Sequence, residues 1–393
     1  MPPQQPQHDA THRLVPSPAV RIHLVEQGTG PLVLLVHGFP EFWYSWRHQL
    51  PALAAAGYRA VAVDVRGYGR SSRPTATEAY RMTELVADNV AVVHALGERS
   101  AVIVGHDWGS TIAAHCALLR PDVFRAVGML GVPYAPPGGP KPSTVFASMG
   151  GDEEFYVSYF QQPGRAEAEI EPDVRGWLAG FYTALSADTM PAPDAPGPYF
   201  VSPGGTLRDR FPTGRRPAWL GETDLDVYAA EFERTGMSGA LARYRTMDRD
   251  WEDLAGHTGA PLTQPSLFIY RTMDRDWEDL AGHTGAPLTQ PSLFIGGALD
   301  ASTAWMGDAI KAFSGTLPGL WCSRILDGCG HWVQQERPEE TNAILTDWLA
   351  ALPAVRERGA PRRTGAGDRA SNMHAKFLFE GSCSQDAQDG DTR

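Results

Sequence analysis

The sequence has few cysteines, few lysines and no long apolar run. Its 393 residues include four cysteines, which have neither the paired spacing of a zinc site nor the density of a disulfide scaffold. We therefore expect no metal and a reduced, cytoplasmic setting. No run approaches the roughly 20 apolar residues of a membrane span, and residues 1–18 lack an apolar secretory core. These absences predict a soluble protein.

Positive charge is also scarce. The chain has 34 Lys and Arg against 46 Asp and Glu, which gives a formal net charge of −12. Such a surface is poorly suited to phosphate backbones or anionic lipid, so we expect neither a nucleic-acid nor a membrane partner. A small uncharged partner is expected instead. With 42% hydrophobic residues, the chain can form one large domain or a domain with an insertion.

Short β-like runs alternate with helical stretches along the chain. They are almost continuously apolar, which is typical of strands in a parallel sheet that is covered on both faces. The runs are residues 31–36, 59–64, 101–104, 124–130, 291–295 and 322–326. This pattern predicts an α/β protein with a mostly parallel central sheet and helices on both faces.

The strand rhythm stops between residues 133 and 255, where the sequence is helical and loop-like with aromatic clusters. We interpret this stretch as a helical cap, or lid, inserted into the sheet domain, and expect loops such as residues 191–207 to shape access to the site. Both ends of the chain are polar and are predicted to be disordered. The predicted parts are residues 1–18 (tail), 19–132 (core), 133–255 (cap), 256–290 (duplicated segment), 291–355 (core) and 356–393 (tail).

A tandem repeat interrupts the second part of the core. Residues 244–269 recur without a change as residues 270–295, and a single pair of copies does not make a solenoid. The first copy continues a helix from upstream, whereas the second continues into a strand and its downstream loop. We therefore expect the helix of copy one and the strand of copy two to occupy the fold, with most of residues 256–290 extruded as a surface loop.

The motif Gly105-His-Asp-Trp-Gly109 stands between an expected strand and an expected helix. Small residues on both sides of a nucleophile allow the strained turn that presents its side chain at the top of a sheet. Alone, the motif fits a tight turn with a solvated aspartate equally well. Asp300 and His331 follow in the chain order of acid and base, although a helix cap and a surface histidine are the alternative interpretations.

An aspartate nucleophile indicates attack on an sp³ carbon. The carboxylate of Asp107 would form an alkyl-enzyme ester, and water activated by His331 would attack that ester at the carbonyl carbon of Asp107. Asp300 would orient His331, and the backbone N–H groups of Phe39 and Trp108 would form the oxyanion hole. The natural electrophiles for this chemistry are epoxides and alkyl halides.

The leaving group distinguishes the two electrophiles. An opening epoxide produces an alkoxide that needs a proton donor, whereas a halide leaves as a stable anion and needs only N–H donors. The expected cap offers three tyrosine hydroxyls, from Tyr156, Tyr159 and Tyr244, any of which can equally be a packing residue.

Between about Arg21 and Leu352 the sequence resembles the α/β-hydrolase-fold epoxide hydrolases of the soluble and microbial type. The motifs that carry the resemblance are residues 37–41, 64–71, 105–109, 159–169, 244–251 and 329–332. The resemblance implies a cap inserted after the sixth strand, with Asp107 as nucleophile, Asp300 as acid and His331 as base. It also implies that Tyr156 and Tyr244 donate protons to the epoxide oxygen and that Tyr159 is a packing residue.

The same resemblance implies a detoxifying hydrolase whose partners are a small hydrophobic epoxide and water, without a cofactor, and it leaves a homodimer open. The expected substrate contacts are His37, Pro40, Trp108, Tyr156, Gln161 and Trp332. The family has a single copy of the repeated segment, so Tyr270 is the alternative to Tyr244.

Two other functions fit parts of the sequence. A haloalkane dehalogenase looks similar at the elbow, including the Trp that follows the nucleophile. Its oxyanion-hole turn usually carries an Asn as a second halide ligand, a role that Phe39 cannot fill. The other alternative is a protein of this fold that is catalytically inactive because of its 26-residue duplication.

Overall fold

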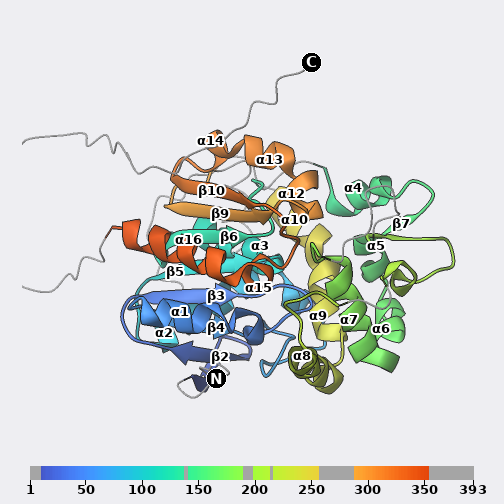
Figure 1. Ribbon diagram of the computed structural model, residues 1–393, viewed down its shortest axis with the longest axis horizontal. Helices are drawn as coiled ribbons and strands as arrows, with labels where there is room; N and C mark the ends of the chain where they lie inside the picture. The colour runs from blue at the N-terminus through green and yellow to red at the C-terminus, as the bar shows by residue number, and fades with distance from the viewer. Residues whose placement is uncertain (1–9, 137–139, 189–197, 213–215, 256–286, 354–393) are drawn as a thin grey trace, which may run out of the picture. The chain divides into compact units, whose positions relative to one another are not determined.

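Eight strands form one central sheet in the computed structural model, which describes residues 10–136, 140–188, 198–212, 216–255 and 287–353 (Figure 1). In sheet order they are β1 (Thr11–Pro16), β2 (Arg21–Gln27), β4 (Arg59–Val63), β3 (Leu32–Val36), β5 (Ala101–His106), β6 (Phe124–Leu130), β9 (Ser292–Gly297) and β10 (Leu320–Leu326). The strands from β4 to β10 are parallel, and β1 and β2 are antiparallel additions. The predicted mostly parallel sheet is confirmed.

Helices cover both faces of this sheet (Figure 1). α1 (Gln49–Ala55) and α16 (Pro338–Ala351) pack on one face, and α2 (Met82–Ala95) and α3 (Trp108–Leu119) pack on the other. Every residue of β3 is buried because its successive side chains enter the two layers alternately. Within the described ranges, no helix combines the length and the apolar character needed to cross a membrane.

The cap consists of the helices between β6 and β9, so it follows the sixth strand (Figure 1). They are α4 (Pro142–Met149), α5 (Tyr156–Gln161), α6 (Arg165–Ile170), α7 (Val174–Ala184), α8 (Glu222–Thr235), α9 (Ser238–Ala242), the 3₁₀ turn η6 (Arg243–Thr246) and α10 (Met247–Ala255). A short antiparallel pair, β7 (Glu154–Phe155) and β8 (Phe200–Val201), adds strand structure that the sequence did not predict. The cap has its own aromatic core, which also contains Phe39 and Trp332 from the sheet domain.

The predicted disorder of residues 1–18 is wrong for β1. Each residue of β1 pairs with β2, from Thr11 opposite Glu26 to Pro16 opposite Arg21. Both strands were missed because they mix polar and apolar residues, whereas the prediction relied on continuous apolar runs. β1 is an edge strand with mostly exposed side chains, and β2, which lies between β1 and β4, buries residues 22–25. Residues 1–9 lie outside the described residues.

The boundary predicted for the extruded segment also needs correction. Leu288 is fully buried and its N–H donates to the carbonyl oxygen of Thr316, while the side chain of Gln290 donates to the carbonyl oxygen of Ala117. Residues 287–290 therefore belong to the core, because they lead directly into β9. Residues 256–286 and the predicted tail at 356–393 lie outside the described residues.

Leu34 tests the importance of the central strand for stability. It is fully buried in β3, opposite Val61 of β4 and Ile103 of β5. We expect Leu34→Ala to lower the free energy of unfolding by about 2–5 kcal/mol, because it leaves a cavity between fixed neighbours. Urea denaturation measures the change. Leu14→Ala in β1, where the side chain is 54% exposed, is the control and should change the value by less than about 0.5 kcal/mol.

Candidate active site

Asp107 occupies a strained turn between β5 and α3. Its φ of 55° and ψ of −122° make it the single non-glycine residue with positive φ in the described part of the chain. A Cβ atom on Gly105 would lie 1.8 Å from the carbonyl oxygen of Gly109, and one on Gly109 would lie 2.0 Å from that of Val36. Only glycine fits at both positions, so the turn presents the carboxylate at the carboxyl end of the sheet.

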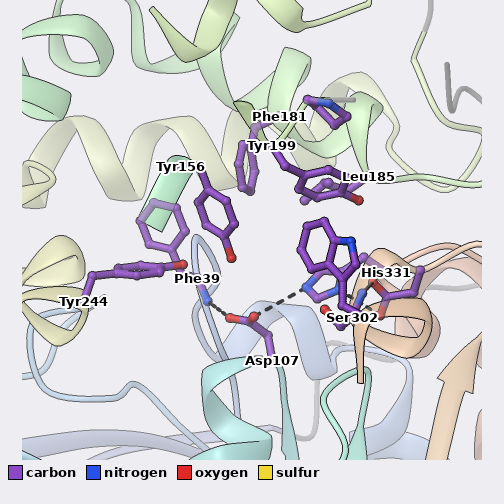
Figure 2. Close-up of a pocket in the computed structure, with 12 residues that line it drawn as sticks. Phe39, Asp107, Tyr156, Phe181, Leu185, Tyr199, Tyr244, Ser302 and His331 are labelled. Atoms are coloured by element: carbon purple, nitrogen blue, oxygen red, sulfur yellow. Dashed lines mark hydrogen bonds and ion pairs between the residues drawn. The ribbon is translucent and has the colours of Figure 1, made fainter. Parts of the chain in front are cut away.

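The structure brings Asp107, Asp300 and His331 together, and Figure 2 shows His331 beside Asp107. The Nε2 atom of His331 is 3.5 Å from Oδ2 of Asp107, and its Nδ1 atom is 3.1 Å from Oδ2 of Asp300. The other oxygen of Asp300 accepts a hydrogen bond from the N–H of Ser302 at the start of α12 (Ala301–Trp305). Asp300 therefore both caps a helix and contacts the histidine. The two interpretations from the sequence, a helix cap and the acid partner of His331, are compatible with each other.

The second oxygen of Asp107 faces the predicted oxyanion hole. The backbone N–H of Phe39 donates to Oδ1 of Asp107 over 2.8 Å (Figure 2). A Cβ atom on Gly38 would lie 2.2 Å from the same oxygen, so this turn approaches the carboxylate more closely than any residue with a side chain allows. Trp108 is the first residue of α3, where a backbone N–H has no acceptor within the helix.

Burial and charge oppose each other at the triad. Burial alone would lower the pKa of the His331 imidazole, but the carboxylates of Asp300 and Asp107 raise that pKa well above its ordinary value. Burial alone would raise the pKa of Asp107, but the hydrogen bond and charge of His331 and the N–H of Phe39 bring it below its ordinary value. The charges of the two carboxylates therefore favour the protonated form of the His331 imidazole.

Tyr156 and Tyr244 extend from the cap toward Asp107. Tyr156 begins α5 and Tyr244 lies in η6, and Figure 2 shows both hydroxyl groups directed into the space beside the Asp107 carboxylate. Their ring centroids are 6.3 Å apart. Burial raises the pKa of both phenols, and the nearby charge of Asp107 raises each further. Both side chains therefore retain their protons and can donate them.

The triad and the two tyrosines surround one pocket between the core and the cap (Figure 2). Its lining consists of Phe39, Asp107, Tyr156, Phe181, Leu185, Pro198, Tyr199, Tyr244, Asp300, Ser302, Trp305 and His331. Pro198 and Tyr199 belong to the loop that was expected to shape access to the site. The sequence reasoning did not single out Phe181, Leu185 or Trp305, because nothing in their local pattern separates them from ordinary core residues.

Five expected substrate contacts are absent from this lining: His37, Pro40, Trp108, Gln161 and Trp332. Their polar groups serve the protein itself. The amide of Gln161 donates to the carbonyl oxygen of Tyr244 over 2.8 Å, and the indole N–H of Trp332 donates to that of Tyr182. Gln161 thus positions a tyrosine instead of contacting the pocket. Tyr159 donates to a carboxylate within the cap, and Tyr270 lies outside the described residues.

Glu41 and His106 support the site, although the sequence reasoning gave them no role. The carboxylate of Glu41 is wholly buried and accepts hydrogen bonds from the N–H of Gly38, from His106 Nδ1 and from two glutamine side chains of α15 (Val333–Glu336). The other ring nitrogen of His106 donates to the carbonyl oxygen of His331. The sequence did contain a signal for this role, because Glu41 stands among aromatic residues. A carboxylate that is buried among such residues must have hydrogen-bond donors around it.

A strained aspartate elbow, a buried His–Asp pair and a helical cap at the carboxyl edge of a parallel sheet define a hydrolase of the α/β class. Residues 31–169 match the family model described as alpha/beta hydrolase fold. Epoxide hydrolase B of Mycobacterium tuberculosis (strain ATCC 25618 / H37Rv) is 40% identical over 376 residues, which cover 87% of this chain and 98% of the relative.

Solved structures agree with this class. The structure titled as an epoxide hydrolase from an endophytic Streptomyces is 65% identical, with a TM-score of 0.80 and coverage of 88% of this chain and 96% of that one. Epoxide Hydrolase A from Mycobacterium thermoresistibile is 41% identical, with a TM-score of 0.76 and coverage of 88% and 99%. The chain belongs to the epoxide hydrolases of the α/β-hydrolase fold, as its resemblance implied.

The charges around His331 can be tested without turnover. Each neighbouring carboxylate stabilises the imidazolium, so Asp107→Asn and Asp300→Asn should both lower the pKa of His331. The effect of Asp300→Asn should be larger, because the charge of Asp300 raises that pKa most. Titration of the histidine ring protons by NMR measures the shift. Ser302→Ala, an uncharged change in the same lining, should leave the pKa in place, and a comparable shift there would contradict the assignment.

Proposed function

We propose that the protein converts a small hydrophobic epoxide to a vicinal diol through a covalent ester on Asp107. The observation that carries the proposal is that the carboxylate of Asp107 shares one pocket with the side chains of Tyr156 and Tyr244. The direction of each pKa shift, lowered for Asp107 and raised for both tyrosines, supports it. The names of the relatives support it. Halide release needs N–H donors and not hydroxyls, so this donor set favours an epoxide over a haloalkane.

In this proposal the two oxygens of Asp107 have different tasks. Oδ1 accepts the N–H of Phe39 and would become the carbonyl oxygen of the ester, while Oδ2 attacks a ring carbon of the epoxide. The carbon–oxygen bond of the ring breaks as the ester bond forms. Tyr156 and Tyr244 bind the departing oxygen, and one of them transfers its proton to the alkoxide.

Ester formation prepares His331 for the second step. Once Asp107 is esterified it carries no charge, so one of the two carboxylates that raise the pKa of His331 is lost and the pKa falls. The proton that His331 then releases restores, directly or through water, the tyrosine that gave its proton to the alkoxide. Neutral His331 removes a proton from water, which attacks the carbonyl carbon of Asp107.

The oxyanion hole acts on the ester of the enzyme itself. Negative charge develops on Oδ1 during the attack by water, where the N–H groups of Phe39 and Trp108 stabilise it. When the ester bond breaks, the second proton of the attacking water passes to the departing alkoxide, which releases the diol, restores the Asp107 carboxylate and leaves His331 protonated as before. Asp300 stabilises the imidazolium throughout, because it remains ionised and in contact with Nδ1.

His331→Gln separates the two steps. The variant should still form the ester but not hydrolyse it, so incubation with styrene oxide should add one substrate mass to the protein, as detected by intact-mass spectrometry. Asp107→Ala is the matched control and should gain no mass. If His331→Gln gains no mass while the unmodified enzyme produces diol, the ester mechanism is wrong.

We infer that copy one of the repeat supplies the active-site tyrosine and copy two supplies the last strands. Arg243 precedes Tyr244, and its guanidinium lies 4.7 Å from the ring centroid of Trp108 and pairs with Asp250. The residue before Tyr270 is Ile269, which can make neither contact. The strand of copy two is the one that leads into Asp300, so a complete triad requires it.

Point substitutions distinguish the two copies. We expect Tyr244→Phe to slow ester formation by about tenfold or more, since a charge-assisted hydrogen bond to the epoxide oxygen is lost. Tyr270→Phe, the identical change in the other copy, should alter the rate by less than about twofold. Rapid-mix mass spectrometry of the adduct in the His331→Gln background measures both rates. The opposite ranking would place the second copy at the active site.

A further inference from the structure

The outer wall of the pocket contains a half-exposed tryptophan. Trp305 ends α12, the short helix that Asp300 caps, and its side chain lines the same pocket as the triad. It is 44% exposed, whereas Asp300 and His331 are 3% and 7% exposed. The pocket therefore runs from a buried reacting end at Asp107 to an open end beside Trp305.

Aromatic contacts with the cap hold Trp305 in place. Its ring meets Tyr199 edge-on at a centroid distance of 4.7 Å and Phe155 at 5.4 Å. The carbonyl oxygen of Tyr199 accepts a hydrogen bond from the N–H of Tyr156, so the same segment of the cap supports a proton donor and the tryptophan. An indole held in this way presents a fixed apolar surface to a ligand. Because the tryptophan side chain is already held in place, it loses little conformational freedom when the ligand binds.

We propose that Trp305 determines substrate specificity by binding the substituent of the epoxide that extends away from Asp107, and that it favours an aryl group. This inference rests on the proposed function. The three-membered ring must lie between Asp107 and the two tyrosines, so a substituent that extends toward the open end of the pocket meets Trp305. The indole surface and its neighbours Pro198 and Tyr199 are suited to stacking with an aryl group, whereas a methyl group offers little surface for such a contact.

Trp305→Ala compares an aryl and a methyl substrate in the same enzyme preparation. We expect the KM for styrene oxide to rise about tenfold with a smaller change in kcat, which is the loss expected of a stacking contact. The kcat/KM for 1,2-epoxypropane should stay within about twofold. Because both substrates are measured on one sample, the ratio of the two kcat/KM values does not depend on the fraction of active protein.

Two further variants provide controls. Leu299 is 45% exposed and directly precedes Asp300, but it does not line the pocket, so Leu299→Ala should leave the ratio unchanged. Trp305→Phe retains an aromatic surface and should keep most of the preference for styrene oxide, while Trp305→Leu should lose it. The comparison of these last two variants decides the question if Trp305→Ala does not fold.

The outcomes separate this inference from the proposed function. Equal losses of kcat/KM for both epoxides in Trp305→Ala would mean that the tryptophan only supports the loop of Asp300, and would overturn the specificity role. No change in kcat/KM for either epoxide would overturn it as well. If the unmodified enzyme hydrolyses neither epoxide, the proposed function itself fails, and the inference fails with it.

Discussion

The buried carboxylate of Glu41 holds the segments of the active site in one arrangement. It accepts hydrogen bonds from the turn of the oxyanion hole, from His106 in the elbow and from α15, and His106 in turn holds the backbone of His331. A carboxylate without contact with water is costly unless donors surround it, so these segments are stable only when they come together. The strained conformation of Asp107 persists because its neighbours are held in this way.

Phe39 connects this arrangement to the cap. Its backbone N–H binds Asp107, while its ring packs edge-on against Phe160, Phe181 and Tyr244 of the cap at centroid distances of 5.5, 5.9 and 5.3 Å. A displacement of the cap would therefore disturb both the hydrogen bond to Asp107 and the position of Tyr244, one of the two proposed proton donors. The same closeness explains the charges, since buried phenols beside an anion stay protonated and a buried imidazole between two anions stays charged.

Much of the fold and the triad could be predicted from the sequence because their signals are local. The buried parallel strands are continuous apolar runs, and the elbow at Asp107 is a contiguous strand, turn and helix whose glycines are needed within that same segment. The order of Asp300 and His331 after the nucleophile restricted the acid and the base to few candidates. The strands β1 and β2 escaped prediction, because they mix polar and apolar residues and contain no continuous apolar run.

Only the tertiary structure decided which side chains meet in the pocket. Trp305 lines it because a core helix touches the β7–β8 pair of the cap, and Gln161 does not because its amide faces the backbone of Tyr244. The two copies of the repeat are identical, so only the residues that flank them indicated in the sequence which part of each copy joins the fold. In the fold their different flanking residues distinguish them, because Arg243 stacks on the elbow beside one copy and Asp300 follows the other. The sequence by itself determined the aspartate elbow at the end of β5, because its turn is a local structure. Long-range packing determined which side chains surround the carboxylate of Asp107.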